Sequence, residues 1–453
     1  MMLTRTLLLL FLQITLAICT NTSYATTISP SKNEHHKQNS FDYEKKPIET
    51  VKNYAVNHAE KAQNNESDAE TLAALSKPLR IPFRYTNGFL IVDIVLNQKL
   101  PLSFIFDTGS KHTILTEADY IPFLGQLPEE EIQIIGSDLT TPMTGRLMRR
   151  TSINIGEVNL ENQSLILLDG NSLNLNVLTG EPIHGILGVG AFGAYGVKIN
   201  YKLERIELLE HEAIRPSKKS TIHPIRIEQS KAYFDVEANI LPGVAQKLSL
   251  LLDTGASLSM LVHTSRADTT LFPKKLVSGT FGYGLGGYLV GYVGRSDLVK
   301  LGPTELPDVV THFQTTRDSN FFEDIPTREG IIGNGILDHF TILIDFTRSE
   351  LHLQQVKKPK KKLAYDRSGM HLVRDGEKLN KIRVQHVSVG SPAYHAQVRE
   401  GDEIIKIGGF PVGIRSLEGI ENLLRGKVGK LVKLTIRRND LVIQKSIRLK
   451  ELI

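Results

Sequence analysis

The chain of 453 residues has little cysteine: its single cysteine, Cys19, lies within the first 25 residues. A protein cut after Ala25 would contain no cysteine and could form no disulfide bond. This composition excludes a small domain held together by disulfide bridges. A chain of this length can instead bury cores large enough to be stable without them.

Several other features are missing. The net charge is only +5, and the one basic run lacks interleaved aromatic residues, so we expect no nucleic-acid partner. The glycine-rich stretch 282–287 is not followed by Gly-Lys-Ser/Thr, which argues against a nucleotide loop. No group of side chains has metal-ligand spacing, so we expect no metal and no other cofactor. Beyond residue 25, no apolar run approaches the length of a membrane span.

The first 25 residues have the pattern of a secretory signal peptide. Arg5 precedes an apolar core from Leu7 to Ile18, and Ser23 and Ala25 place small residues before a cleavage site. We therefore expect an exported protein. The absence of disulfides favours the bacterial periplasm as its location.

Two alternatives to cleavage at residue 25 involve contact with a membrane. The segment could be retained as a signal anchor, or Cys19 could carry a lipid. Ile18 stands where a lipoprotein signal normally has a small residue, which speaks against lipidation. Residues 26–76 are polar, and we interpret them as a linker, with an inhibitory propeptide as the alternative.

The tripeptide Asp-Thr-Gly occurs twice, at Asp107-Thr108-Gly109 and at Asp253-Thr254-Gly255. Each copy ends an apolar run, 102–106 in the first case and 248–252 in the second. A single copy could simply mark a turn, for which Asp and Gly are well suited. Two copies in matching surroundings indicate an internal duplication.

A second pair of elements supports the duplication. Gly185-Ile186-Leu187-Gly188 follows the first tripeptide, and Gly330-Ile331-Ile332-Gly333 follows the second. The spacing between the two Asp-Thr-Gly tripeptides is almost the same as the spacing between the two Gly-apolar-apolar-Gly elements. Such a shared spacing indicates a repeat of the size of a lobe. We expect lobes at 77–213 and 214–356, each contributing one aspartate.

At these residues the chain resembles the aspartic proteases, specifically the two-lobed, single-chain, pepsin-like enzymes. The resemblance implies a mainly β fold, a duplicated-lobe β-barrel, with Asp107 and Asp253 as the catalytic pair. It also implies that Thr108 and Thr254 tie the two loops together. Ser110 follows the first tripeptide but Ala256 follows the second, so one hydroxyl bond to a carboxylate oxygen is expected to be missing.

The residue types suit this chemistry in their own right. Two carboxyl groups within hydrogen-bonding distance cannot both ionise and therefore share a proton. The ionised member can take a proton from water while the protonated member polarises the scissile carbonyl. Gly109 and Gly255 allow close approaches that a Cβ would obstruct.

A hairpin in each lobe could cover the substrate and exclude water. The first candidate runs from 133 to 148, with Gly145 near its turn, and the second spans 282–288 with Gly284, Gly286 and Gly287. Pepsin-like enzymes carry a tyrosine on the first hairpin, but this chain has none between 120 and 195. Glycines at these positions are also compatible with simple turns or bulges.

A basic run at 357–363 is expected to be a linker, and 364–453 to be a third domain. Gly390-Ser391-Pro392-Ala393 and the Gly-Asp-x-Ile-x-x-Ile-x-Gly pattern at 401–409 resemble a bacterial PDZ domain, an α+β fold. A helix is predicted from Leu417 to Leu424, capped by Ser416.

The resemblance to PDZ domains implies that a peptide adds a strand to the sheet and that backbone amides capture its C-terminal carboxylate. By family position, the binding residues would be Ser368, Gly369, Met370, His371 and Leu372. The alternative is a stabilising appendage that binds no peptide.

We therefore predict an aspartic endopeptidase that acts on proteins or peptides, with the PDZ domain recruiting substrates. We expect a monomer, because one chain supplies both aspartates. The competing interpretation is a non-catalytic, peptide-binding envelope adaptor on the same fold.

Overall fold

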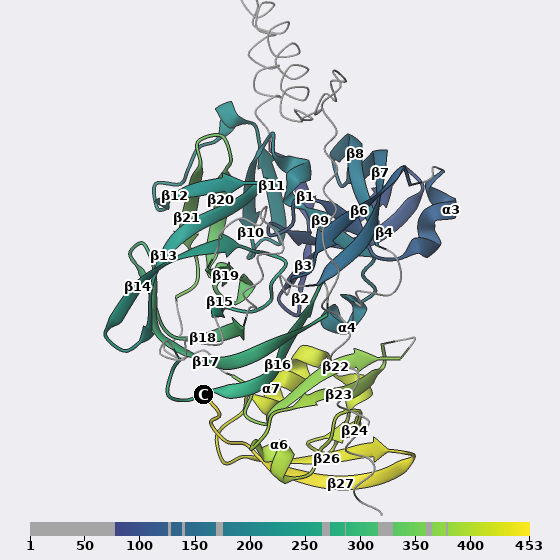
Figure 1. Ribbon diagram of the computed structural model, residues 1–453, viewed down its shortest axis with the longest axis vertical. Helices are drawn as coiled ribbons and strands as arrows, with labels where there is room; N and C mark the ends of the chain where they lie inside the picture. Colours follow the sequence, from purple (N-terminus) through teal and green to yellow (C-terminus); the bar gives the residue numbers. More distant parts are fainter. Residues whose placement is uncertain are drawn as a thin grey trace, which may run out of the picture. The chain divides into compact units, whose positions relative to one another are not determined.

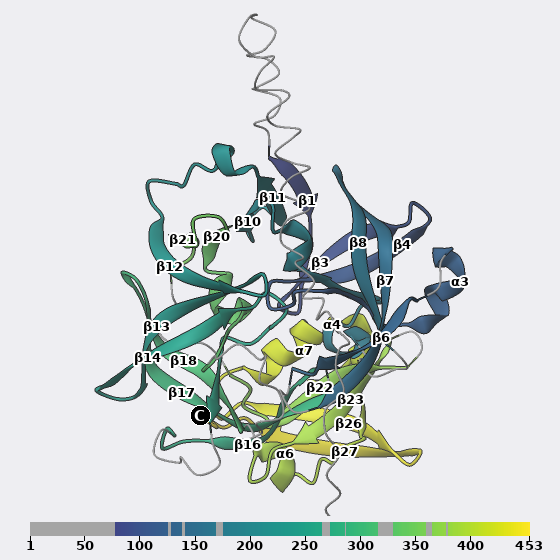
Figure 2. The same cartoon turned by 45° about the horizontal axis from the view of Figure 1, so that its top comes forward.

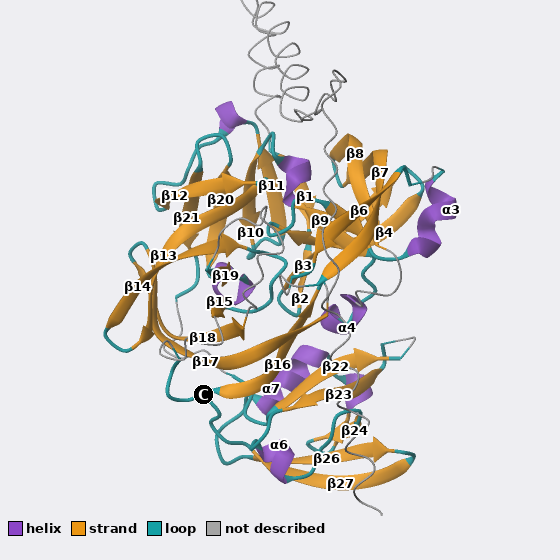
Figure 3. Cartoon of the chain, in the orientation of Figure 1, coloured by secondary structure: helices purple, strands orange, loops and turns teal. Residues whose placement is uncertain are grey.

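The computed structural model describes residues 78–125, 128–137, 141–168, 175–264, 272–285, 287–315, 329–358, 365–376 and 379–453. The expected signal peptide and the segment 26–76 lie outside these residues, as does most of the basic run after Lys358. Strands dominate the described chain, and its helices are short (Figure 3). Among the described residues, no helix is long and apolar enough to cross a membrane.

One sheet has eight strands, all from the first half of the described chain (Figure 1). In spatial order the strands are β2 (Arg84–Thr86), β3 (Phe89–Leu96), β4 (Leu100–Asp107), β9 (Gly185–Gly188), β5 (Thr113–Leu115), β8 (Val158–Leu168), β7 (Pro142–Ile155) and β6 (Glu130–Ile135). β4 and β9 are parallel, with Asp107 opposite Gly188. The first aspartate thus lies beside the Gly-Ile-Leu-Gly element.

A second sheet has thirteen strands. In spatial order they are β1 (Leu79–Pro82), β11 (Arg205–Leu209), β10 (Gly196–Asn200), β20 (Phe340–Asp345), β21 (Glu350–Gln355), β12 (Thr221–Glu228), β13 (Lys231–Leu241), β14 (Val244–Leu252), β19 (Gly330–Ile332), β15 (Met260–Thr264), β18 (Thr304–Thr315), β17 (Gly287–Leu301) and β16 (Val277–Gly284). β14 and β19 are parallel, as β4 and β9 are. β10 and β20 join the two halves of the chain, with Val197 opposite Ile344.

The run from β12 to β16 has the same strand order as the eight-stranded sheet. In each case the strand that leads to Asp-Thr-Gly is flanked by its hairpin partner and by the Gly-apolar-apolar-Gly strand. The additional pairing of β3 with β7 has its counterpart in the pairing of β13 with β17. The two sequence motifs therefore occupy equivalent places in the two strand orders.

Alternating polarity explains why these segments form strands with one buried face. In β13, Val236, Ala238 and Ile240 are buried, whereas Asp235 and Glu237 between them are exposed. Side chains point alternately to opposite faces of a strand, so this pattern directs one face into the core. That core is one continuous cluster, with members from both halves such as Phe104, Phe192, Phe234 and Phe313.

The third sheet is built from residues after 365 and has its own core, which includes Ile404, Ile420 and Leu434. Its strands are β22 (Met370–Asp375), β23 (Lys381–Val387), β24 (Glu403–Ile407), β26 (Leu431–Arg438) and β27 (Leu441–Arg448), with β25 (Phe410–Pro411) paired to β24. The predicted helix is confirmed as α7 (Leu417–Leu424). The Ser416 side chain accepts a hydrogen bond from the Gly419 amide at 3.1 Å and so caps it.

The remaining helical segments are single turns that connect strands. They are α3 (Ile121–Leu124), α4 (Leu175–Thr179), α5 (Asn334–Leu337) and α6 (Pro392–His395), together with the 3₁₀ segments η1 (Ala118–Tyr120), η2 (Val189–Phe192), η3 (His211–Ala213) and η4 (Val412–Ile414). Figure 2 shows α7 and α4 in a second view. The described residues all belong to one compact unit.

Candidate active site

The two Asp-Thr-Gly tripeptides lie at the ends of equivalent strands. Asp107 is the last residue of β4, and Asp253 follows the last residue of β14. The amide of Asp253 donates to the carbonyl oxygen of Ile332 at 3.0 Å, which fixes the second loop to β19. The parallel strand pairs β4–β9 and β14–β19 thus position the two aspartates.

The structure brings the two aspartates together although 145 residues lie between them. A Cβ built on Gly109 would lie 2.7 Å from Cγ of Asp253, and one on Gly255 would overlap Cγ of Asp107. The two carboxyl groups are hydrogen bonded to each other. Glycine is required at both positions because any side chain would push the opposite carboxyl group away.

Backbone amides hold each carboxylate in place. Gly109 donates its amide hydrogen to Oδ1 of Asp107 at 2.7 Å, and Gly255 donates to Oδ1 of Asp253 at 2.8 Å. Burial raises the pKa of Asp107, whereas the bond to Asp253 and the amides of Gly109, Gly255 and Ser110 oppose the rise. Since both carboxyl groups lie in one partly desolvated site, a single shared proton is the favoured state of the pair.

The two threonines form a mirrored network across the loops. The hydroxyl of Thr108 accepts from the amide of Thr254 at 3.0 Å and donates to the carbonyl oxygen of Leu252 at 2.8 Å. The hydroxyl of Thr254 accepts from the amide of Thr108 at 3.0 Å and donates to the carbonyl oxygen of Phe106 at 2.9 Å. Both threonines are buried, so each loop is fixed by the other without help from solvent.

The residues after the tripeptides differ from the expected arrangement. Ser110 directs its hydroxyl to the carbonyl oxygen of His112 at 2.8 Å, a bond within its own loop. Its backbone amide, and not its side chain, is the group that donates to Asp107. The Ser110 side chain thus makes no hydrogen bond to a carboxylate in the first loop. Ala256 at the equivalent place in the second loop therefore loses no such bond.

Sequence reasoning missed a buried polar residue below the second loop, Asn334. Its side-chain amide donates to the carbonyl oxygens of Gly88 and Thr254, both at 2.7 Å, and its oxygen accepts from the hydroxyl of Tyr201 at 2.7 Å. Asn334 follows the second Gly-Ile-Ile-Gly element, where the first copy has Val189. A polar residue in place of an apolar one was the signal that could have revealed it.

The two candidate hairpins meet at their tips. The amide of Ser137, after β6, donates to the carbonyl oxygen of Leu285, between β16 and β17, at 2.5 Å. The Leu285 side chain packs against a cluster from the first half that includes Met143 and Ile166. The hairpin of the second half thus contacts the hairpin of the first.

The glycines of these hairpins differ in their position relative to the turns. Gly284 and Gly287 are paired at the turn of the second hairpin, and Gly286 lies outside the described residues. The expectation for Gly145 was wrong: it lies within β7 opposite Ile132, because the turn falls between 135 and 142. A Cβ on Gly145 would lie 2.6 Å from Cγ2 of Ile166, so glycine is needed here for packing against β8.

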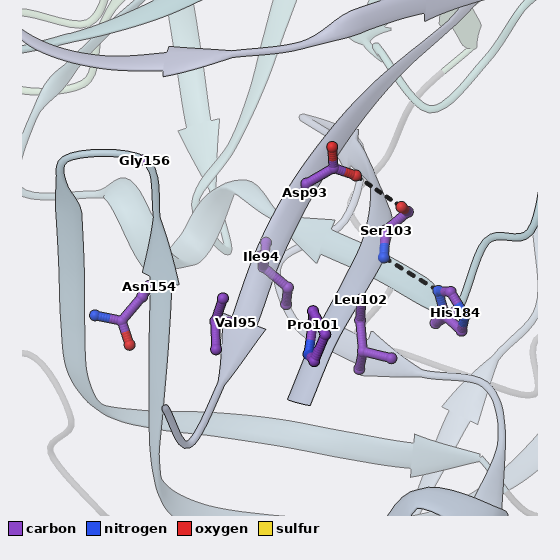
Figure 4. Close-up of a pocket in the computed structure, with 9 residues that line it drawn as sticks. All are labelled: Asp93, Ile94, Val95, Pro101, Leu102, Ser103, Asn154, Gly156 and His184. Atoms are coloured by element: carbon purple, nitrogen blue, oxygen red, sulfur yellow. Dashed lines mark hydrogen bonds between the residues drawn. The ribbon is translucent and has the colours of Figure 1, made fainter. Parts of the chain in front are cut away.

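A hollow of about 300 Å³ on the eight-stranded sheet includes neither aspartate of the pair (Figure 4). It contains Asp93, Ser103 and His184, a combination that suggests a serine nucleophile. The geometry contradicts that role: the Ser103 hydroxyl donates to Asp93 at 2.7 Å, and Nδ1 of His184 accepts from the backbone amide of Ser103 at 3.1 Å. The imidazole therefore has no bond to the hydroxyl that it would need to activate.

The expected peptide-binding residues lie at the start of the third sheet. Met370, His371 and Leu372 belong to β22, and Ser368 and Gly369 form the preceding loop. Gly369 has φ +79°, and a Cβ there would overlap the side chain of Ser391. Glycine is thus required by both the backbone and the packing of this loop.

Comparison with known families agrees with this geometry. Residues 92–191 match the aspartyl protease family, and residues 383–438 match the PDZ domain. The first match includes Asp107 and β9 but ends before Asp253. No curated protein matches the chain. The chain carries an aspartyl protease family domain and a PDZ domain, and the latter implies binding of a peptide ligand.

Proposed function

We propose that the protein is an aspartic endopeptidase in which Asp107 and Asp253 share one proton. The observation that carries this proposal is the contact of the two carboxyl groups between loops that the two threonines join in a mirrored network. We further propose a two-lobed arrangement that arose by duplication, with lobes at 77–213 and 214–356. The repeated strand order supports it.

In the proposed reaction, the ionised carboxylate takes a proton from a water molecule held between the two aspartates. The protonated partner donates a hydrogen bond to the scissile carbonyl and favours its attack by that water. The amides of Gly109 and Gly255 keep the carboxyl groups in position, so little reorganisation is needed when charge moves between them.

The meeting hairpins are proposed to act as a lid over this site. Because the hydrogen bond from Ser137 to Leu285 joins their tips, a peptide would enter only after that contact opens. Closure over the bound peptide would exclude water and strengthen the electrostatic interactions within the site.

The remaining proposals concern the whole chain. We propose export to the bacterial periplasm on a cleaved signal peptide at 1–25, and a linker or inhibitory propeptide at 26–76. The protein would act as a monomer, since the two aspartates of one chain already meet. The PDZ domain would bring peptide segments of protein substrates to the protease domain.

The decisive experiment is digestion of a denatured, unbiased peptide mixture by the chain lacking residues 1–76, from about pH 3 to pH 7. Asp107→Asn and Asp253→Asn should each abolish the cuts while the variants stay folded. Asp235→Asn, a change of an exposed aspartate on β13, is the matched control and should leave the cuts unchanged. If the folded protein makes no cut at any pH, the non-catalytic adaptor is the better description.

A further inference from the structure

The loop that would capture a ligand carboxylate in the PDZ domain already holds a carboxylate of its own. One oxygen of Asp366 accepts from the amides of Ser368, at 3.0 Å, and Gly369, at 2.5 Å. Its other oxygen accepts from the Ser368 hydroxyl at 2.7 Å. The third amide of the loop, from Met370, donates to the same hydroxyl at 3.1 Å. All three amides expected to bind a peptide terminus are therefore occupied.

This arrangement is part of a well-fixed loop. Ser368 is fully buried, and Arg367 anchors the loop to the end of α7. The backbone amide of Arg367 donates to the carbonyl oxygen of Leu424 at 3.1 Å, and its guanidinium donates to those of Arg425 and Gly426 at 2.6 and 3.0 Å. The loop thus has its shape, and a carboxyl group of its own bound to its amides, without a ligand.

β22, beside this loop, is the edge strand of its sheet and can pair with a further strand. β22 pairs with β23 on one side, and no described strand pairs with its other side. α7 packs beside β22, and α4 approaches its far end, where Gly180 lies near Arg374. An extended segment can add to such an edge through backbone hydrogen bonds alone.

Charge decides which kind of segment fits. A terminal carboxylate placed at the loop would face the carboxyl group of Asp366, and Glu421 of α7, which pairs with Arg425 at 2.8 Å, lies near that group. It would find no free amide donor among Ser368, Gly369 and Met370, because these bonds are made within the loop. A buried charge that faces another carboxyl group and finds no hydrogen-bond donor is strongly disfavoured.

We propose that Asp366 takes the place of a ligand's terminal carboxylate, so that this PDZ domain binds internal extended segments of proteins and not free C-terminal tails. The proposal rests on peptide binding by the PDZ domain and is independent of proteolysis. It makes Asp366 the residue that determines which peptides bind.

The test uses the full chain with Asp107→Asn, so that no probe is cut, on an array of immobilised random heptapeptides. Each heptapeptide is made twice, with a free C-terminal carboxylate and with a carboxamide. The chain should bind both forms of a sequence equally, within about twofold. Adding Asp366→Ala empties the loop and should make the carboxylate forms bind at least about tenfold better than the carboxamides, since charge-assisted bonds to the amides of Ser368 and Gly369 become available.

Two further variants keep the result interpretable. Asp366→Asn retains an acceptor for the amides and should keep the two forms nearly equal. Asp375→Ala removes a carboxylate from the same strand, where it pairs with Arg383, and should also leave the ratio near one. Thermal unfolding shows which variants fold. If Asp366→Ala does not fold, the ratio in the unaltered loop decides.

Three outcomes would overturn the proposal. The first is a tenfold preference of the unaltered loop for free carboxylates. The second is a folded Asp366→Ala variant whose ratio stays near one. The third is the absence of binding to either form by the unaltered loop and by every variant. None of them bears on whether Asp107 and Asp253 hydrolyse peptides, which the digestion experiment tests separately.

Discussion

At the scale of single residues, the site depends on buried polar groups whose partners belong to distant parts of the chain. Thr108 and Thr254 satisfy each other's loops, and Asn334 joins the second loop to Gly88 and Tyr201. A buried hydrogen bond contributes only about 1 kcal/mol net, but a buried group left without its partner costs about 1–3 kcal/mol. Removal of one such side chain should therefore cause a large loss in the free energy of unfolding.

Asn334→Ala should lower the free energy of unfolding by about 3 kcal/mol, because two carbonyl oxygens and the Tyr201 hydroxyl lose their partner. Tyr201→Phe should cost about 1 kcal/mol. Burial raises the pKa of Tyr201 well above its usual value, so its hydroxyl remains a donor throughout the working range of pH. Denaturant unfolding measures both effects.

The two changes should not be additive, since they remove opposite ends of one bond. Asn159→Ala provides the matched control: its exposed side chain binds Glu161, and we expect a loss below about 0.5 kcal/mol. Additive losses for Asn334 and Tyr201 would show that the pair does not act as one network.

The residues of the aspartate loops could be predicted from sequence because each role requires one residue type in a repeated context. Asn334 and Asp366 could not. Asn334 acts through Gly88 and Tyr201, which come together only in the folded chain. Asp366 lies two residues from the loop it fills, but its position alone does not reveal that its side chain turns back onto the amides.

At the scale of elements, α7 could be predicted from the spacing of its apolar residues, whereas the meeting of the two hairpins could not. Leu285 is an ordinary apolar residue in a glycine-rich turn. Its contact with the first-half cluster depends on the length and bend of β16 and β17, which a local pattern does not contain. The same limit explains the error at Gly145, since the turn of the first hairpin was placed too late.

Leu285→Ala should loosen the contact between the hairpins without unfolding the protein. Loss of part of a leucine's packing costs about 1–2 kcal/mol here, because the side chain is only half-buried. Hydrogen exchange of amides in β6, β7, β16 and β17 should become about tenfold faster, while exchange in β13 and β14 stays the same. This readout does not depend on catalysis.

Val290→Ala is the control for this change. Val290 belongs to the same hairpin but is 60% exposed, so its truncation should leave exchange unaltered. Equal exchange in Leu285→Ala and in the unaltered chain would mean that the tips are held by their backbone bond alone.

At the scale of the whole molecule, histidines lie where the PDZ domain meets the strands of the protease region. His371 of β22 is close enough to His312 of β18 for their protonated forms to repel each other. It stands in the same relation to His386 of β23. Gly279 of β16 lies beside Nε2 of the His386 ring, and Nδ1 of the same ring is hydrogen bonded to Glu400 at 2.7 Å. Val293, Val310 and Ile453 form a small apolar cluster at the same contact.

The pKa of His312 is lowered to about 4, mainly by burial and also by repulsion from His371, against a bond to the carbonyl oxygen of Met260 that raises it. Burial likewise lowers the pKa of His371 to about 4, with His386 acting in the same direction and Gln385 opposing it. Both histidines are therefore neutral in the folded protein at pH 5, whereas in an unfolded chain they would be protonated. Their stabilising contribution is complete above about pH 6.5 and is lost as the pH falls towards 4.

Between pH 7 and pH 5, each histidine should remove about 2 kcal/mol from the free energy of unfolding. His371→Gln should make this loss smaller by about that amount, as measured by denaturant unfolding at the two values of pH. His395→Gln, a change of an exposed histidine on α6, should leave the loss as it is in the unaltered chain. The same loss in all three proteins would exclude His371 as a cause. If the prediction holds, acid weakens the packing around His371, where β22 of the PDZ domain lies near β18.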